Sequence, residues 1–201
     1  MRTSYFAELQ RLGGRTITTA QAAAAWRVPT SSASRILRDL AKADLVESLR
    51  HGLWLLERGA TAESLAAEIT APYPSYVSHV SALYSHGVID QVPAEIHLVS
   101  AAASRRLRSS RGTYRLHRMP AELFGGYAIV RGAPLASPEK ALFDWAYLSV
   151  VSGKPNARLP ETEWPSGFRQ AEIETWLARI ASPRIRTMTQ SLIARRSPAR
   201  R

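Results

Sequence analysis

The sequence predicts an α+β protein in which a small helical N-terminal domain with one hairpin is followed by a larger domain of mixed helices and strands. Two observations lead to this prediction. In the first sixty residues, apolar side chains recur at helical spacing and then fall into two short strand-like runs. From residue 61 onward, helical periodicity is interspersed with β-branched and alternating stretches. We therefore expect two domains, residues 1–58 and 61–201, joined by a short linker at 56–61.

The first domain begins with two helices. The first is predicted from four apolar residues at helical spacing ahead of Gly13-Gly14, a usual helix end: Tyr5, Phe6, Leu9 and Leu12. The second begins at Thr18, because Thr18 and Gln21 are three apart and form a capping box before an alanine-rich stretch that ends at Trp26.

A third helix and a hairpin complete the first domain. The helix follows a break at residues 28–30, and its apolar stripe consists of Ala33, Ile36, Leu37, Leu40 and Ala43. Two strand-like runs, 45–49 and 53–56, then flank a basic turn that contains Gly52. Three helices followed by a basic hairpin are the layout of a winged helix-turn-helix module, in which the third helix enters the major groove of DNA.

The third helix and the turn carry the candidate DNA-binding residues. The apolar stripe leaves short hydroxyls and basic side chains facing outward, and these can donate to phosphates and base edges. The candidates are Ser31, Ser32, Ser34, Arg35, Arg38, Lys42, Arg50 and His51. The same pattern fits the solvated face of a protein–protein adaptor, but the basic turn and the charge of the chain favour DNA.

The overall composition narrows the classes of partner and chemistry. Twenty-seven Lys and Arg against 16 Asp and Glu give a net charge of +11, which indicates a polyanionic partner, nucleic acid first and an anionic membrane surface second. The absence of cysteine excludes disulfide scaffolds, cysteine-containing zinc sites, iron–sulfur clusters and a cysteine nucleophile. No apolar run approaches about 18 residues and residues 1–6 lack a signal-peptide pattern. We expect a soluble cytoplasmic protein without a membrane partner.

The second domain is predicted to contain five helices and three strands. The helices are expected at 62–70, 78–86, 137–151, 170–180 and 183–195, and the strands at 95–100, 113–117 and 127–130. The helix start at Ser137 is the strongest of these signals, because an N-cap hydroxyl is followed by proline and then by an acidic residue. The tail to Arg201 is basic, and we expect it to be frayed.

Arginines concentrate in two further places. Six of them lie within fourteen residues that contain no acidic residue, and we expect them to form a basic surface: Arg105, Arg106, Arg108, Arg111, Arg115 and Arg118. Six more lie near the C-terminus: Arg184, Arg186, Arg195, Arg196, Arg200 and Arg201. A solvated basic face is the plainer interpretation, but this density favours contact with nucleic acid or another anion.

Catalytic patterns are missing from the sequence. His79 and His86 could share a helix face, but no third ligand follows at metal spacing, so a capping or core role is favoured over a metal site. The chain contains no Glu-x-Lys or Asp-x-Lys nuclease tripeptide, no glycine-rich phosphate loop and no Gly-x-Ser-x-Gly. We therefore expect a protein that is not an enzyme and has no metal or cofactor.

The densest cluster of informative residues is the segment 137–145. Lys140 and Asp144 are four apart and can form an ion pair on a helix. The apolar side chains around them, Leu142 and Trp145 among them, predict a central core helix buried on more than one side.

Two phrases of the sequence, in this order and behind the predicted winged helix, resemble the AbiEi family of antitoxins. The first is Ser-Tyr-Val-Ser-His-Val-Ser-Ala-Leu-Tyr-Ser-His-Gly-Val-Ile at 75–89, and the second is Ser-Pro-Glu-Lys-Ala-Leu-Phe-Asp at 137–144. The resemblance implies a bifunctional protein. Its winged helix binds double-stranded DNA at inverted repeats upstream of its own operon and represses transcription, as an autorepressor. Its C-terminal antitoxin domain neutralises a cognate nucleotidyltransferase toxin, in several members without a stable complex, and the protein is expected to be a monomer or weak dimer.

Two alternatives remain open at this point. One is a winged-helix transcription factor whose second domain senses a ligand or dimerises, and the other, with little support, is a nucleic-acid enzyme. A nucleotidyltransferase gene directly downstream distinguishes an antitoxin from the first alternative.

Overall fold

The structure is a computed structural model and describes residues 2–197. It is a mixed α+β fold that divides into two compact units. The first unit comprises residues 1–61 and 108–112, and the second comprises 62–107 and 113–201. Arg200 and Arg201 of the predicted basic tail lie outside the described residues.

The first unit contains the three predicted helices and the predicted hairpin. In chain order its elements are α1 (Arg2–Arg11), β1 (Thr16–Thr18), α2 (Thr19–Trp26), α3 (Thr30–Lys42), β2 (Glu47–Arg50) and β3 (Leu53–Leu55). β1, which the sequence patterns did not predict, pairs antiparallel with β3, and β3 pairs antiparallel with β2. The result is a three-stranded sheet beside three helices.

The core of the first unit forms where the apolar stripes of the helices meet. Leu9 of α1, Ala22 of α2 and Leu37 of α3 are fully buried within one cluster. The predicted capping box of α2 is confirmed, because the Thr18 hydroxyl accepts from the Gln21 amide at 3.2 Å and the Gln21 side chain accepts from the Thr18 amide at 2.8 Å. Local capping therefore fixes the start of α2 and packing fixes its face.

The second unit is built on one mixed sheet of six strands. Its strands are β4 (Ser75–Val77), β5 (Ile96–Ser100), β6 (Arg105–Ser109), β7 (Gly112–Arg118), β8 (Tyr127–Val130) and β9 (Ala133–Ala136), and the turn between β6 and β7 counts with the first unit. The order across the sheet is β6-β7-β5-β4-β9-β8, with parallel pairing of β5 with β7 and of β4 with β9. The sequence predicted β5, β7 and β8 but missed β4, β6 and β9.

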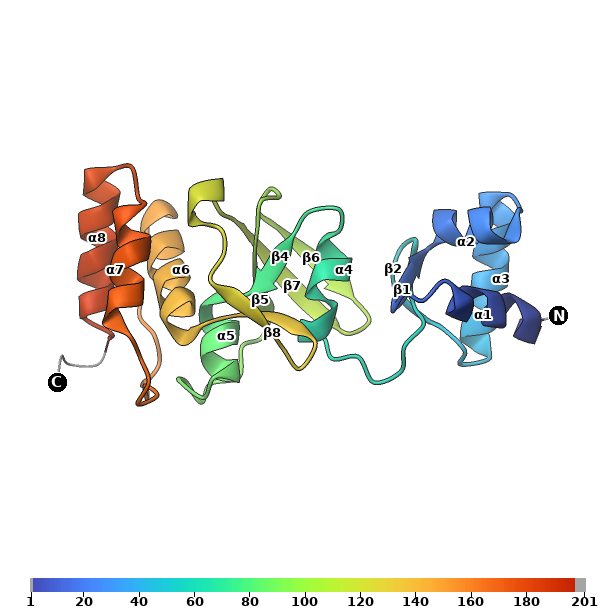
Figure 1. Ribbon diagram of the computed structural model, residues 1–201, viewed down its shortest axis with the longest axis horizontal. Helices are drawn as coiled ribbons and strands as arrows, with labels where there is room; N and C mark the ends of the chain where they lie inside the picture. The colour runs from blue at the N-terminus through green and yellow to red at the C-terminus, as the bar shows by residue number, and fades with distance from the viewer. Residues whose placement is uncertain (1, 198–201) are drawn as a thin grey trace. The chain divides into compact units, whose positions relative to one another are not determined.

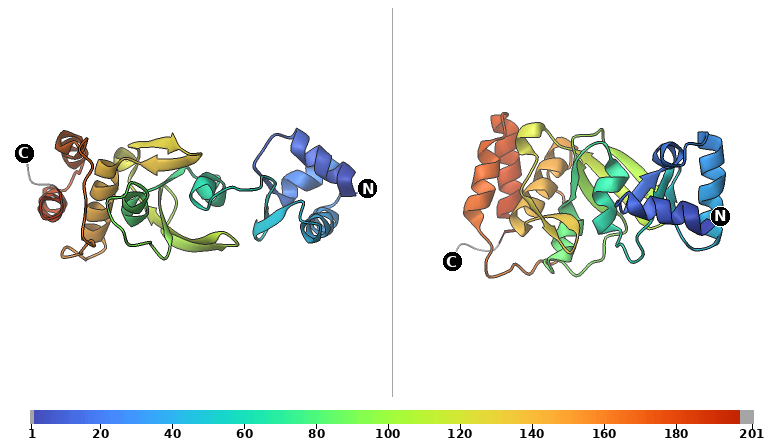
Figure 2. Two further views of the ribbon diagram at one scale, coloured as in Figure 1. Left: turned by 90° about the horizontal axis from the view of Figure 1, so that it is seen from below. Right: turned by 45° about the vertical axis from the view of Figure 1, so that its right-hand side comes forward.

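The helices of the second unit include a buried one at the centre. They are α4 (Ala66–Thr70), α5 (His79–Ser85), α6 (Pro138–Val151), α7 (Gln170–Ala178) and α8 (Pro183–Ala194), with two single 3₁₀ turns at Glu63–Leu65 and Ala121–Leu123. Figures 1 and 2 show α6 between the sheet and the pair α7 and α8. The prediction of a central core helix is confirmed, since Leu142 is 0 % and Trp145 is 3 % exposed.

Ser137 begins α6 as predicted, with its hydroxyl accepting from the Lys140 amide at 3.1 Å.

Within residues 2–197, no helix combines the length and the apolar character that crossing a bilayer requires.

Candidate nucleic-acid interface

α3 presents one apolar and one polar face. Ala33, Leu37 and Leu40 are fully buried against the other helices, which leaves the opposite side of the helix to solvent. On that side, Arg38 Nε donates to the carbonyl oxygen of Ser34 at 3.2 Å, and Lys42 lies 3.5 Å from Asp39 with 78 % of its side chain exposed. The polar face therefore keeps its cations accessible.

A groove of about 910 Å³ lies between α3 and the β2–β3 turn. Five of the eight predicted DNA-binding residues line it, together with Thr19, Thr30 and Trp54: Ser31, Ser34, Arg38, Lys42 and His51. The turn is held against α2, because the Thr19 amide donates to the Gly52 carbonyl at 2.9 Å and the Trp54 indole donates to the Thr19 hydroxyl at 3.0 Å. Hydroxyls, two cations and a histidine are thus brought together on one anchored surface.

The remaining three predicted residues lie outside the lining of this groove. Ser32 is half-buried and Arg35 is exposed, both on α3. Arg50 is half-buried, and its Nε is buried without a hydrogen-bond partner among the described residues. Arg35 is therefore available to a ligand, whereas the Nε of Arg50 is not exposed to one.

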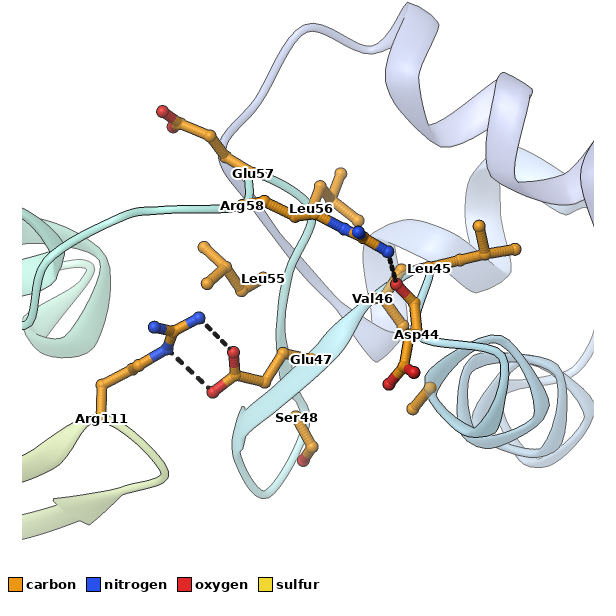
Figure 3. A pocket seen from close by; sticks show the side chains of 11 residues that line it. Asp44, Leu45, Val46, Glu47, Ser48, Leu55, Leu56, Glu57, Arg58 and Arg111 are labelled. Atoms are coloured by element: carbon orange, nitrogen blue, oxygen red, sulfur yellow. Dashed lines mark hydrogen bonds and ion pairs between the residues drawn. The ribbon is translucent and has the colours of Figure 1, made fainter.

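A second hollow of the first unit, of about 590 Å³, contains an ion pair (Figure 3). Arg111 Nε donates to Glu47 Oε1 at 3.0 Å while its Nη2 pairs with Oε2, and the Ser110 hydroxyl also donates to Oε1. Burial raises the pKa of Glu47, but the hydrogen bonds from Ser110 and Arg111 outweigh it, and the pKa lies below its ordinary value. The positive charge of Arg111 is therefore compensated inside the first unit.

The six arginines predicted as one basic surface are all exposed but are not equivalent. Arg106 pairs with Glu95, and Arg111 pairs with Glu47. Arg108 and Arg111 also belong to the first unit rather than to the second, where we expected them. Within the described part of the chain, no ion pair compensates the other members of the set, and three of these lie in the second unit: Arg105, Arg115 and Arg118.

Three histidines meet on α5, β5 and β7, a cluster that the sequence did not predict. His97 Nδ1 and His117 Nε2 are 2.9 Å apart, and the ring of His79 stacks on both rings at 4.5 and 5.2 Å. Burial lowers the pKa of His97 and of His117 to about 4 and that of His79 well below its ordinary value. The positive charge of Arg115 also lowers the pKa of His97 and of His117. The negative charge of Glu95 raises the pKa of His97 and so opposes this effect.

These rings are therefore neutral at pH 7. No group of three or more His, Asp or Glu among residues 2–197 is arranged to hold a metal ion. His86, the other histidine considered for a metal, contacts the Ala136 carbonyl oxygen at 2.7 Å.

The two phrases singled out in the sequence are joined by a buried polar cluster. Asp144 accepts hydrogen bonds from the Tyr76 hydroxyl at 3.0 Å and the Ser78 hydroxyl at 2.7 Å, and its other oxygen pairs with Lys140. Lys140 Nζ also donates to the Leu123 carbonyl at 2.8 Å. The side chains of Tyr76, Ser78, Lys140 and Asp144 are all 0 % exposed, so no substrate can reach them in this conformation.

The surroundings of this cluster are aromatic and tightly packed. Lys140 Nζ lies 4.4 Å from the ring centre of Trp176, a cation–π distance. Burial raises the pKa of Asp144 and lowers that of Lys140, while the attraction between the two opposes both shifts. Gly126, with φ of 73°, passes so close that a Cβ would lie 2.8 Å from Trp176 and 2.9 Å from Lys140. The cluster therefore connects the sheet, α6 and α7 as a structural unit.

No protein-family model matches the chain, and no curated protein matches it.

Proposed function

We propose that the first unit is a winged helix-turn-helix domain that binds double-stranded DNA through α3. The order of its elements supports this, because a helix, a short strand, two helices and a hairpin, with the first strand completing the sheet, are typical of that fold. The observation that carries the proposal is the groove in which Ser31, Ser34, Arg38 and Lys42 face His51 of the turn.

The chemistry of this surface suits a nucleic acid. Serine hydroxyls at the N-terminal end of α3 lie where the helix dipole attracts phosphate. Arg38 and Lys42 follow about one and two turns after Ser34, and Arg35 stands exposed between Ser34 and Arg38. Cations of this kind neutralise phosphates, and arginine also contacts guanine with two hydrogen bonds.

A gel shift on the DNA upstream of the gene tests this proposal. We expect Arg35→Ala combined with Arg38→Ala to weaken binding and to flatten the dependence of log K on log salt by about one unit for each arginine–phosphate interaction that is removed. Arg11→Ala combined with Arg184→Ala removes the same charge from residues that do not line the groove, and this variant should bind like the wild type. Equal binding by the α3 variant and the wild type would exclude α3 as the DNA-binding helix.

We further propose that the protein is an AbiEi-like antitoxin that represses its own operon and neutralises a nucleotidyltransferase toxin in the cytoplasm. The resemblance of the two phrases supports the family, and the exposed arginines of the second unit support neutralisation by binding. Arg105, Arg115 and Arg118 can contact an acidic surface of the toxin or the nucleic acid that the toxin uses.

Co-expression with the product of the neighbouring gene, scored by growth, tests the antitoxin role. We expect rescue by the wild type and by the Arg35 and Arg38 double variant, and loss of rescue when Arg105, Arg115 and Arg118 are all changed to Ser in a chain that is still folded by circular dichroism. Co-elution with the toxin indicates direct binding, whereas a requirement for antitoxin in proportion to RNA indicates competition for substrate. A wild-type chain that does not rescue growth contradicts the antitoxin role and favours a transcription factor.

A further inference from the structure

The two edges of the six-stranded sheet differ in their protection. β6, at one edge, carries Arg105, Arg106 and Arg108, and charged side chains on an edge strand discourage pairing with another chain. β8, at the other edge, has no charged residue, and all four of its residues are exposed, with Ile129 at 69 %. In the part of the chain that the structure describes, no strand pairs with its outer side. Such an edge is a site for strand pairing.

The hairpin of β8 and β9 determines which backbone groups face outward. Its turn consists of Arg131 and Gly132, with φ of 50° and 78°, the positive pair that a two-residue type I′ turn requires. Val130 and Ala133 flank this turn as directly opposed residues, and in such a hairpin the pair beside the turn exchanges both hydrogen bonds.

From that pair, hydrogen-bonded and non-hydrogen-bonded positions alternate along the hairpin. Ile129 is opposite Pro134 in a non-hydrogen-bonded pair, which agrees with the missing N–H of proline. The N–H and C=O groups of Ile129, and two residues earlier those of Tyr127, therefore point to the free edge. Ala128, between them, has its backbone groups directed toward β9.

We propose that β8 is a dimerisation strand, which pairs antiparallel with β8 of a second copy of this chain across a two-fold axis. The proposal goes beyond the proposed function and does not depend on it. One register uses both outward residues: Tyr127 exchanges hydrogen bonds with Ile129 of the second copy, Ile129 does so with Tyr127 of the second copy, and Ala128 lies opposite Ala128 on the axis.

The side chains in this register favour a second copy as the occupant. Tyr127 lies directly across from Ile129 of the other copy on the same face, and aromatic–β-branched pairs stabilise antiparallel strands. Arg131 lies opposite Gly125, and Val130 opposite Gly126, so no like charges oppose each other although each chain carries +11. A four-residue strand buries much less than the about 800 Å² per partner of a stable interface, so the dimer is weak and reversible.

Cysteine cross-linking tests the register directly, because the chain has no cysteine of its own. Residues in a non-hydrogen-bonded antiparallel pair have Cα atoms about 4.5 Å apart, which is within the range that a disulfide spans. We expect Ala128→Cys in the full-length chain to form a disulfide-linked dimer under mild oxidation, and Val92→Cys, at an exposed loop position, to stay monomeric. Equal cross-linking of the two variants would overturn the proposed pairing.

Sedimentation velocity over a concentration series tests the association without a cross-link. The wild type should shift toward a dimer as its concentration rises to about 500 µM, since a weak dimer dissociates at micromolar to millimolar concentration. Ile129→Lys should raise the dissociation constant at least about tenfold, and Val92→Lys, at a residue of nearly equal exposure, 68 %, should leave it unchanged. A wild type that is monomeric throughout, an Ile129→Lys variant that dimerises normally, or equal loss in both variants refutes the proposal.

Discussion

Breaking the buried pair of Lys140 and Asp144 should destabilise the second unit far more than removing both charges together. Each side chain is 0 % exposed, so solvent cannot screen the charge that a single substitution leaves behind. Lys140→Met and Asp144→Asn should each cost about 3–5 kcal/mol, the usual cost of an uncompensated buried charge. The double variant contains neither charge, and the asparagine that replaces Asp144 can still accept from Tyr76 and Ser78. We expect its cost to be well below the sum of the two single costs.

Urea unfolding measures this difference, with the fluorescence of the second unit's tryptophans as the signal. Trp176 lies beside Lys140 and reports on the site itself, while Trp26 and Trp54 belong to the first unit and can be replaced by Phe to isolate the transition. The comparison requires similar m values, because a changed m indicates a changed unfolding reaction. If the double variant loses the sum of the single costs to within about 0.5 kcal/mol, the two residues do not interact and the reasoning is refuted.

Three further predictions concern the second unit. Leu142→Ala should cost about 2–5 kcal/mol and lower the thermal midpoint, because it leaves a cavity at a fully buried position of α6, and an unchanged midpoint contradicts this placement. Gly126→Ala should cost at least about 1 kcal/mol in urea unfolding, because its positive φ and the close approach of Trp176 leave no room for a Cβ; wild-type stability would show that the loop can move. The free energy of unfolding of the second unit should have its full value above about pH 6.5, the ordinary pKa of histidine, and should fall as the pH drops toward 4. Burial lowers the pKa of His97 and His117 to about 4 in the folded state, so the unfolded chain takes up protons first as the pH falls. A urea midpoint equal at about pH 7 and about pH 4.5 contradicts the last of these.

Local signals predicted the helices well. The stripe of Ala33, Leu37 and Leu40 and the start of α6 at Ser137 depend on residues within a turn or two of each other, and the structure agrees with both. The strands that were missed depend on distant partners. β4 has only three residues, and the hydroxyl of its Tyr76 finds its partner on Asp144 of α6; β9 contains Pro134, and β6 shows arginines where an apolar alternation is expected.

The candidate functional residues show the same difference between features set by nearby residues and features set by distant partners. Helical register was enough to place Ser31, Ser34, Arg38 and Lys42 on one face of α3, because that face is defined within one helix. The histidine cluster needs the parallel register of β5 and β7, which no pattern within either strand contains. The pairing of Arg111 with Glu47 joins residues 64 apart in the sequence, so a count of arginines overstated the free positive charge.

The buried cluster also limits what the resemblance can say about function. The two phrases that carry it meet at Asp144, where Tyr76, Ser78 and Lys140 satisfy the carboxylate out of reach of solvent. These four residues can stabilise the second unit, but they cannot contact a toxin or a nucleic acid while it is folded. A similarity that depends on them therefore reports how this unit folds, and the proposed neutralisation must depend on residues outside the cluster. Some of the exposed arginines form ion pairs with acidic residues and others do not. The growth assay therefore has to change the arginines without an ion pair, which in the second unit are Arg105, Arg115 and Arg118.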